Sequence, residues 1–236
     1  MKQIKVEDLA KQISLLKWYA AAITLVVISL IIFMLKTRNN NIKELTVERI
    51  NIVEKNGKLR MVLSNRARQH PGRMDNRDFP KRDRPAGLIF FNDEGDECGG
   101  LGYNGDKQEA AMFMTMDQYK NDQIMVWSYD QNNMPGQKYK SYGFTLNDRD
   151  DLPFQKQIQY FDSLKSLKDT SAYNAGLNKY KTAGHLAQRM FLGKSKSGEV
   201  GLFLADSKGR PRIKIFINDK NQPVIQTLDE QGKIVE

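Results

Sequence analysis

The chain has 236 residues, 40% of them hydrophobic, with 37 Lys and Arg against 28 Asp and Glu and a net charge of +9. That length suits one soluble domain of roughly 150–200 residues with little left over. The ordinary content of charged and aromatic residues excludes a wholly disordered chain. The single cysteine, Cys98, excludes an internal disulfide framework and a cysteine-based zinc site.

An uncharged stretch near the N-terminus predicts a transmembrane helix. Residues 18–35 read WYAAAITLVVISLIIFML, and a helix of that length spans about 27 Å, close to the roughly 30 Å hydrocarbon core of a bilayer. The hydroxyls of Thr24 and Ser29 can return to carbonyls of the same helix. Large residues follow the apolar run where a cleavage site needs small ones, so we expect a retained signal-anchor.

The charges that flank this segment leave its orientation nearly open. Four basic residues precede it and four follow it, so the positive-inside rule favours neither orientation clearly. A short tail ahead of a signal-anchor usually stays in the cytoplasm. We therefore expect a single-pass protein of the inner (cytoplasmic) membrane with the large domain outside the cytoplasm. Residues 1–17 are expected to form an amphipathic tail against the headgroups, and residues 36–43 a linker with an Asn-rich hinge at 39–41.

Beyond the linker, alternating apolar and polar residues predict a mostly-β domain over residues 44–236. Two alternating runs flank an Asn-Gly turn at Asn56-Gly57, the strongest short hairpin signal. Near the C-terminus turn residues recur at intervals of 11, 12 and 11 residues, at Gly198, Gly209, Asn221 and Gly232. This spacing predicts an up-and-down series of short strands.

The middle of the chain adds three strand candidates and a helical interlude. Strands are expected at residues 110–117, 123–129 and 141–147, and helix over residues 153–184. Apolar residues recur at helical spacing at Phe154, Ile158, Phe161, Leu164 and Leu167, so one helix face can cap a sheet edge or core. The expected fold is therefore an antiparallel β sandwich or barrel of short hairpins with a small helical insertion.

The two ends of this domain also resemble each other in sequence. RINIVEKNGKLRMVLSN, from Arg49, matches RMFLGKSKSGEVGLFLAD, from Arg189, in its basic start, turn glycine and alternating apolar positions. GLIFFNDEG, ending at Gly95, matches IKIFINDKN, ending at Asn221. A structural duplication and convergent hairpin chemistry both explain the match.

A basic loop over residues 66–85 is the main candidate binding segment. Arginine suits two-point recognition of phosphate or carboxylate, and the prolines of the loop keep it extended. Anionic headgroups, nucleic acid and solvent alone are three possible neighbours for it. The candidate anion-binding residues are Arg66, Arg68, Arg73, Arg77, Lys81, Arg82 and Arg84.

No catalytic, metal or cofactor site is expected. Cys98 lacks a base at suggestive spacing, since His70 lies in the basic loop, which we expect to be mobile, and nothing links His185 to the thiol. The acidic run at residues 92–97 lacks calcium-loop spacing and suits a hairpin tip. No phosphate loop, hydrolase elbow, zinc-helix or dinucleotide fingerprint is present.

The anchor, the opening RINIVEKNGKLRMVLSN, the block GLIFFNDEGDECGG and the closing GLFLADSKGRPRIKIFIND resemble uncharacterised bacterial single-pass membrane proteins with a repetitive mostly-β domain. The resemblance spans most of the chain. It implies a bacterial setting and assigns no catalytic or binding residue.

Together these features favour a membrane-anchored, non-enzymatic binding or scaffold module at the bacterial cell envelope. Its partners would be the lipid bilayer and anionic headgroups or envelope proteins, with nucleic acid disfavoured. One alternative is a membrane-associated enzyme that acts on envelope polymers through the carboxylates of residues 93–97. Another is a nucleic-acid binder at the cytoplasmic face, whose binding would be sensitive to salt.

Overall fold

A computed structural model describes residues 6–37 and 42–235. The chain divides into two compact units, Met1–Val47 and Glu48–Glu236. The predicted Asn-rich hinge at residues 39–41 lies outside the described residues, as do residues 1–5 of the predicted tail.

The first unit contains one long helix, α1 (Val6–Thr37), which includes the predicted transmembrane segment. Thr24 donates its hydroxyl to the carbonyl of Ala20 at 2.8 Å, as expected for a polar residue in an apolar helix. The helix is long and apolar enough to cross a membrane. It begins at Val6, so residues 6–17 continue the same helix instead of forming a separate amphipathic stretch.

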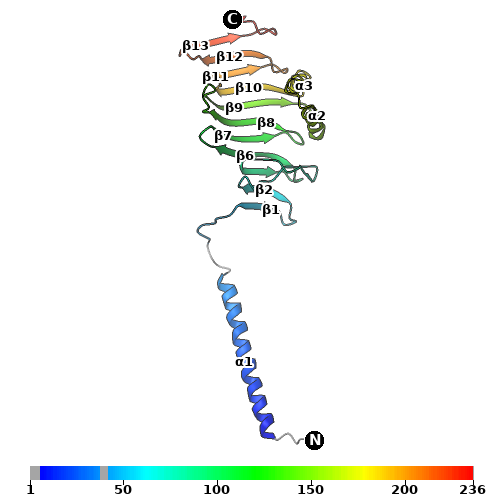
Figure 1. Cartoon of the computed structure of the whole chain (residues 1–236), viewed down its shortest axis with the longest axis vertical. Helices are drawn as coiled ribbons and strands as arrows, with labels where there is room; N and C mark the ends of the chain where they lie inside the picture. The colour runs from blue at the N-terminus through cyan, green and yellow to red at the C-terminus, as the bar shows by residue number, and fades with distance from the viewer. Residues whose placement is uncertain (1–5, 38–41, 236) are drawn as a thin grey trace. The chain divides into compact units, whose positions relative to one another are not determined.

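The second unit is built on one antiparallel sheet of eleven strands, whose spatial order follows their order along the chain (Figure 1). Short hairpins join most neighbours, which explains why local alternation and turn residues predicted many of the strands. The strands are β1 (Arg49–Val53), β2 (Leu59–Ser64), β5 (Ala86–Phe91), β6 (Glu97–Gly105), β7 (Glu109–Asp117), β8 (Gln123–Asn132), β9 (Tyr139–Arg149), β10 (Leu186–Lys194), β11 (Val200–Ala205), β12 (Pro211–Ile217) and β13 (Pro223–Thr227).

The predicted mostly-β class, the N-terminal helix and the antiparallel hairpins are confirmed. The layering is different, because the eleven strands form one open sheet in place of a sandwich or a barrel. Only β2 pairs with β1 and only β12 pairs with β13 in this sheet, so the ends do not close on each other. Sandwich and barrel both require non-neighbouring strands to meet, and each connection here returns the chain to the adjacent position.

One turn geometry recurs along the sheet, and the matching segments GLIFFNDEG and IKIFINDKN share it. In the β5–β6 hairpin the backbone N–H of Gly95 donates to the carbonyl of Asn92, and the Asn92 side chain accepts from the N–H groups of Glu94 and Asp96. Asn or Asp side chains bind the backbone in the same way at three later turns, which begin at Asp206, Asn218 and Asp229.

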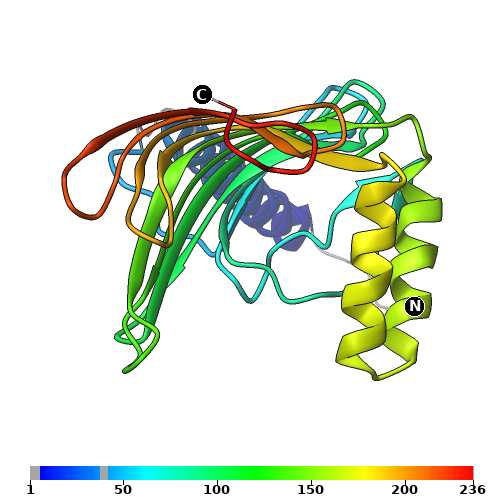
Figure 2. The same ribbon diagram turned by 90° about the horizontal axis from the view of Figure 1, so that it is seen from above.

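The two faces of the sheet have different surroundings. Val62 and Ile89 are fully buried on one face, which we call the inner face, beneath the basic loop. The sheet bends around this face, and the two helices between β9 and β10, α2 (Phe154–Ser166) and α3 (Thr170–Thr182), lie on the inner side of the bend (Figure 2). We call the opposite face the outer face; its side chains alternate with the inner ones along every strand.

A row of glycines runs across the inner face, in which Gly87 pairs with Gly102 and Gly193 pairs with Gly143 and Gly201. An added Cβ at Gly201 would lie 2.1 Å from the carbonyl oxygen of Ile215. Glycine in a strand interior permits bending and close approach of neighbouring backbone. The row therefore accommodates the curvature of the sheet.

Two insertions pack on the inner face. The basic loop contains a two-strand hairpin, β3 (Arg73–Met74) and β4 (Arg77–Asp78), and buries Met74. The predicted helical interlude forms α2 (Phe154–Ser166) and α3 (Thr170–Thr182) between β9 and β10. Asp169 caps α3 by accepting from the N–H groups of Ser171 and Ala172.

Candidate functional site

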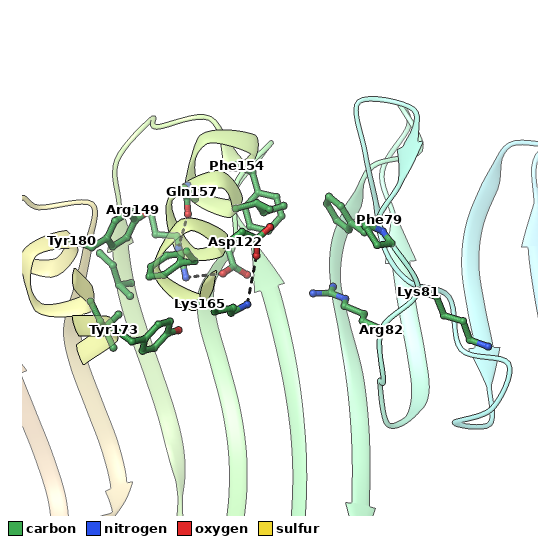
Figure 3. Close-up of a pocket in the computed structure, with 16 residues that line it drawn as sticks. Phe79, Lys81, Arg82, Asp122, Arg149, Phe154, Gln157, Lys165, Tyr173 and Tyr180 are labelled. Carbon is green, nitrogen blue, oxygen red and sulfur yellow. Dashed lines mark hydrogen bonds and ion pairs between the residues drawn. The ribbon is translucent and has the colours of Figure 1, made fainter. Parts of the chain in front are cut away.

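A cavity of about 620 Å³ lies between the basic loop, the helix pair and the ends of three strands or their turns (Figure 3). Ligand sites commonly have volumes of roughly 300–1,000 Å³. Most of the wall is apolar, with rings and aliphatic groups from the loop and both helices. These apolar lining residues are Phe79, Pro80, Phe154, Ile158, Phe161, Tyr173, Leu177, Tyr180 and Leu186.

The apolar wall follows directly from the amphipathic pattern of α2. Phe154, Ile158 and Phe161 share one face of that helix and line the cavity. Phe154 meets Phe79 of the loop edge-on, with ring centroids 5.7 Å apart, and Phe161 packs against Tyr180 of α3 at 5.0 Å. These contacts connect the loop and α3 through α2, so they hold the cavity walls together.

A hydrogen-bonded network centred on Arg149 forms the polar side of the cavity. The guanidinium pairs with Asp122 at 3.0 Å and donates to the carbonyl of Gln123 at 2.9 Å. It also donates to the side chain of Gln157 at 3.4 Å, and Gln157 in turn donates to Asn121 at 2.7 Å. Since the donors of Arg149 are used within the protein, this arginine positions the strand ends and the helix relative to each other.

Arg82 is a cation of the cavity lining that the protein leaves available. Its Nε donates to the carbonyl of Pro71 at 3.0 Å, and its guanidinium carbon lies 5.6 Å from the ring centre of Phe79. None of the ion pairs among the described residues includes Arg82. Desolvation lowers its pKa, followed by the nearby charge of Arg84, but an arginine stays protonated at neutral pH. Its side chain remains exposed to solvent at the cavity.

The structure engages four of the seven predicted anion-binding residues with carboxylates. Two of these pairs are exposed, one is partly exposed, and Arg84 with Glu97 is the most buried, held by two hydrogen bonds of 2.9 and 2.7 Å. A bidentate pair of this kind fixes the end of the loop on β6. The four pairs are Arg66 with Asp83, Arg68 with Glu48, Arg73 with Asp78, and Arg84 with Glu97.

The other three predicted residues are Arg77, Lys81 and Arg82. Arg77 is exposed on β4 and does not line the cavity. Lys81 belongs to the cavity lining, but Figure 3 shows its side chain directed away from the helices. Of the seven, Arg82 is therefore the residue that the structure directs toward the apolar cavity.

His70 is buried within the basic loop, where the sequence suggested a mobile segment. His70 is 4% exposed, its Nδ1 accepts the N–H of Gly72 at 3.0 Å, and its ring packs edge-on against Phe91. Burial is the main cause that lowers the pKa of His70, so the ring is neutral at physiological pH. The sequence gives no local sign of this burial, because it arises from contact with Phe91 on a strand that follows His70.

The acidic run at residues 92–97 forms the predicted hairpin tip. Asp93 pairs with Arg60, Glu94 accepts from Tyr119 at 3.0 Å, and Glu97 binds Arg84. These carboxylates do not line the cavity. The arrangement therefore gives no support to the alternative in which they form an enzymatic site.

Three further titratable groups are Cys98 and His185, which the sequence analysis considered as catalytic candidates, and Asp117, which it did not consider. Burial and then the charge of Asp117 raise the pKa of the Cys98 thiol, which keeps it protonated and weakly nucleophilic. Asp117 itself has a pKa raised to about 7, mainly by burial and then by the charges of Asp122 and Glu97. His185 follows α3 and pairs with Asp150, and the described contacts do not join it to Cys98.

The basic loop and the apolar face of α2 were predictable from the sequence, but the cavity that forms between them was not. Arg149 and Asp122 carried no local signal, because their partnership joins residues 27 positions apart. No family model matches the chain, and no curated protein or solved structure resembles it significantly.

Proposed function

We propose that the chain is a single-pass, membrane-anchored binding module of the bacterial cell envelope, without enzymatic activity, whose cavity takes an anionic amphiphile. The ligand would have a slim apolar part, such as an acyl chain, and a carboxylate or phosphate head. The observation that carries the proposal is the pairing of a largely apolar cavity with a cation, Arg82, that points toward the helices and has no ion pair among the described residues.

The two parts of the site have complementary roles in binding. The apolar wall from α2 and α3 removes the tail from water, which is favourable by about 25 cal/mol per Å² of buried apolar surface. The Arg82 guanidinium offers its two terminal nitrogens to the head, because its Nε is already bound to Pro71. The Arg149 network holds the wall in place. Because Arg149 is paired with Asp122, its charge is neutralised within the protein.

The membrane anchor supplies the ligand's source. Helix α1 is long and apolar enough to span a bilayer, and an anchored domain meets amphiphiles at far higher effective concentration than a free one. We place the anchor in the inner membrane with the β domain outside the cytoplasm, which makes envelope lipids the source.

The test uses the full chain in phosphatidylcholine nanodiscs and a photoreactive C16 fatty acid, with its methyl ester as the neutral match. The acid should label peptides from residues 154–182, and Arg82→Ala should reduce that labelling about tenfold, the effect of losing one charge-assisted hydrogen bond. Arg77→Ala, on the same loop but outside the cavity, is the matched control and should change little. Equal labelling by acid and ester, unaffected by Arg82→Ala, would contradict the proposal.

A further inference from the structure

The outer face of the sheet carries an unbroken apolar row. Taking one residue from each strand in hydrogen-bonding register, all eleven side chains are apolar from one edge of the sheet to the other. We call this set the central row. It consists of Ile50, Leu63, Leu88, Leu101, Met114, Trp127, Phe144, Leu192, Leu202, Ile215 and Ile225.

The adjacent row on the same face, which we call the second row, repeats the pattern. Only Gly99 and Thr227 break its apolar character. Its members are Ile52, Met61, Phe90, Gly99, Met116, Met125, Leu146, Met190, Leu204, Ile213 and Thr227.

Nothing in the described part of the second unit covers these two rows, because the basic loop and both helices pack on the inner face. Trp127 is 68% exposed and Ile225 71% exposed. An antiparallel sheet with one covered face normally presents polar residues on the other. An apolar strip this continuous marks an interaction surface.

The dimensions of the strip fit a protein interface. Eleven strands at about 4.8 Å spacing give a length of about 48 Å, and two rows with their side chains have a width of about 14 Å. The strip thus offers about 700 Å² per copy, or about 1,400 Å² for two, within the standard range of specific interfaces. Both rows lie on the same side of the glycine row, so the bend does not interrupt the strip.

We propose that the strip is covered by the same strip of another copy of this chain, so that two sheets pack face to face. The occupant must be apolar and continuous over the full length of the sheet. A second copy of the chain meets both requirements because it carries the same strip. Neither row contains a charged side chain, so the approach of two strips desolvates no charge. The β sandwich that the alternation pattern predicts then forms between chains, with its layers about 10 Å apart.

A bilayer is the competing occupant, but the strip lacks the row of basic residues that usually flanks a membrane-bound surface. Surfaces that lie on membranes combine apolar side chains with flanking Lys and Arg that reach the headgroups. The row next to the central row on its other side contains one such residue, Lys194, together with tyrosines from β6, β8 and β9. Self-association explains the uniform strip without that contribution.

The first test places a photoreactive phenylalanine analogue at Trp127 in the full chain, in native membranes. Illumination should give a product of twice the chain mass whose cross-linked peptides come from the outer-face strands. The analogue at Lys107, in the exposed β6–β7 turn, is the control and should give none. A lipid adduct or an unchanged monomer at position 127 would overturn the proposal.

The second test separates the strip from association through the anchor. Trp127→Glu combined with Ile215→Glu should convert the full chain in detergent from an oligomer to a monomer by light scattering. Lys107→Glu combined with Lys138→Glu should leave the mass unchanged. The folded state of each variant is checked by circular dichroism, and an oligomer that survives the paired glutamates in a folded protein would also overturn the proposal.

Discussion

At the scale of single residues, Asp117 is the group whose environment most changes its chemistry. It lies at the end of β7, and its Oδ1 is buried without a hydrogen-bond partner among the described residues. Burial and the charges of Asp122 and Glu97 raise its pKa from 3.8 to about 7. The folded protein therefore holds a proton there that the unfolded chain releases at lower pH.

This difference predicts a pH-dependent stability. The stabilising effect of the held proton is complete below about pH 4 and is lost as the pH rises to about 7, so the free energy of unfolding falls across that window. Three pH units set an upper limit of about 4 kcal/mol. Asp117→Asn removes the ionisation, so we expect the variant to exceed the wild type in stability at pH 8 and to match it more closely at pH 4.5.

Urea unfolding at the two pH values measures this effect. Asp219→Asn, at an exposed turn, is the control and should leave the pH dependence unchanged. An Asp117→Asn variant whose stability falls between pH 4.5 and pH 8 as steeply as that of the wild type would show that Asp117 titrates normally.

At the scale of elements, the glycine row determines how the strands can curve. At Gly143 an added Cβ would lie 2.4 Å from the carbonyl oxygen of Leu192 and 2.7 Å from the ring of Phe191. Backbone cannot move aside as a flexible side chain can, so Gly143→Ala should lower the stability of the domain by about 2–4 kcal/mol. Ser128, which pairs with Gly143 in the same row, already carries a Cβ.

Thermal unfolding of Gly143→Ala and of the matched control Ser128→Ala tests this reasoning. The glycine variant should lose several degrees in melting temperature, whereas the serine variant should change by about a degree. Equal effects of the two substitutions would mean that the row does not need glycine.

Elements were predictable where the signal was local. The Asn-Gly turn, the later turn residues and the 3.6-residue period of α2 each lie within a few residues of the structure they specify, and those elements are confirmed. The layering was not predictable, because alternation shows that one face of a strand is apolar without showing what covers it. A strip such as the central row produces the same pattern whether its cover comes from the same chain or from elsewhere.

The candidate site was likewise predictable only where its residues carry a local signal. The basic loop was found from composition, but four of its cations bind carboxylates such as Asp83 and Glu97, and only the fold reveals those pairs. Arg82 could not be distinguished from its neighbours in sequence. Arg82 differs from the other basic residues because Phe79 packs against Phe154, which places this part of the loop at the mouth of the cavity.

At the scale of the whole molecule, the proposed topology can be measured through a single introduced thiol. In a Cys98→Ser background, Lys43→Cys lies after α1 and is exposed. A membrane-impermeant maleimide should label it in cells whose outer membrane alone is permeabilised, if the β domain lies outside the cytoplasm.

Gln3→Cys, ahead of α1, is the matched control and should be labelled only after the inner membrane is opened. The reverse pattern would place the β domain in the cytoplasm, where acidic lipids of the inner leaflet become the amphiphiles to test.

The sequential order of the sheet has a consequence for how the domain assembles. Each strand hydrogen-bonds to strands that adjoin it along the chain, so assembly requires no pairing between distant segments. Low contact order favours rapid folding, and stability in such linear arrays is a sum over neighbours. The N-terminal hairpins can therefore form while later strands are still emerging from a ribosome or a translocon, and loss of a C-terminal hairpin would leave a shorter sheet with its remaining pairings intact.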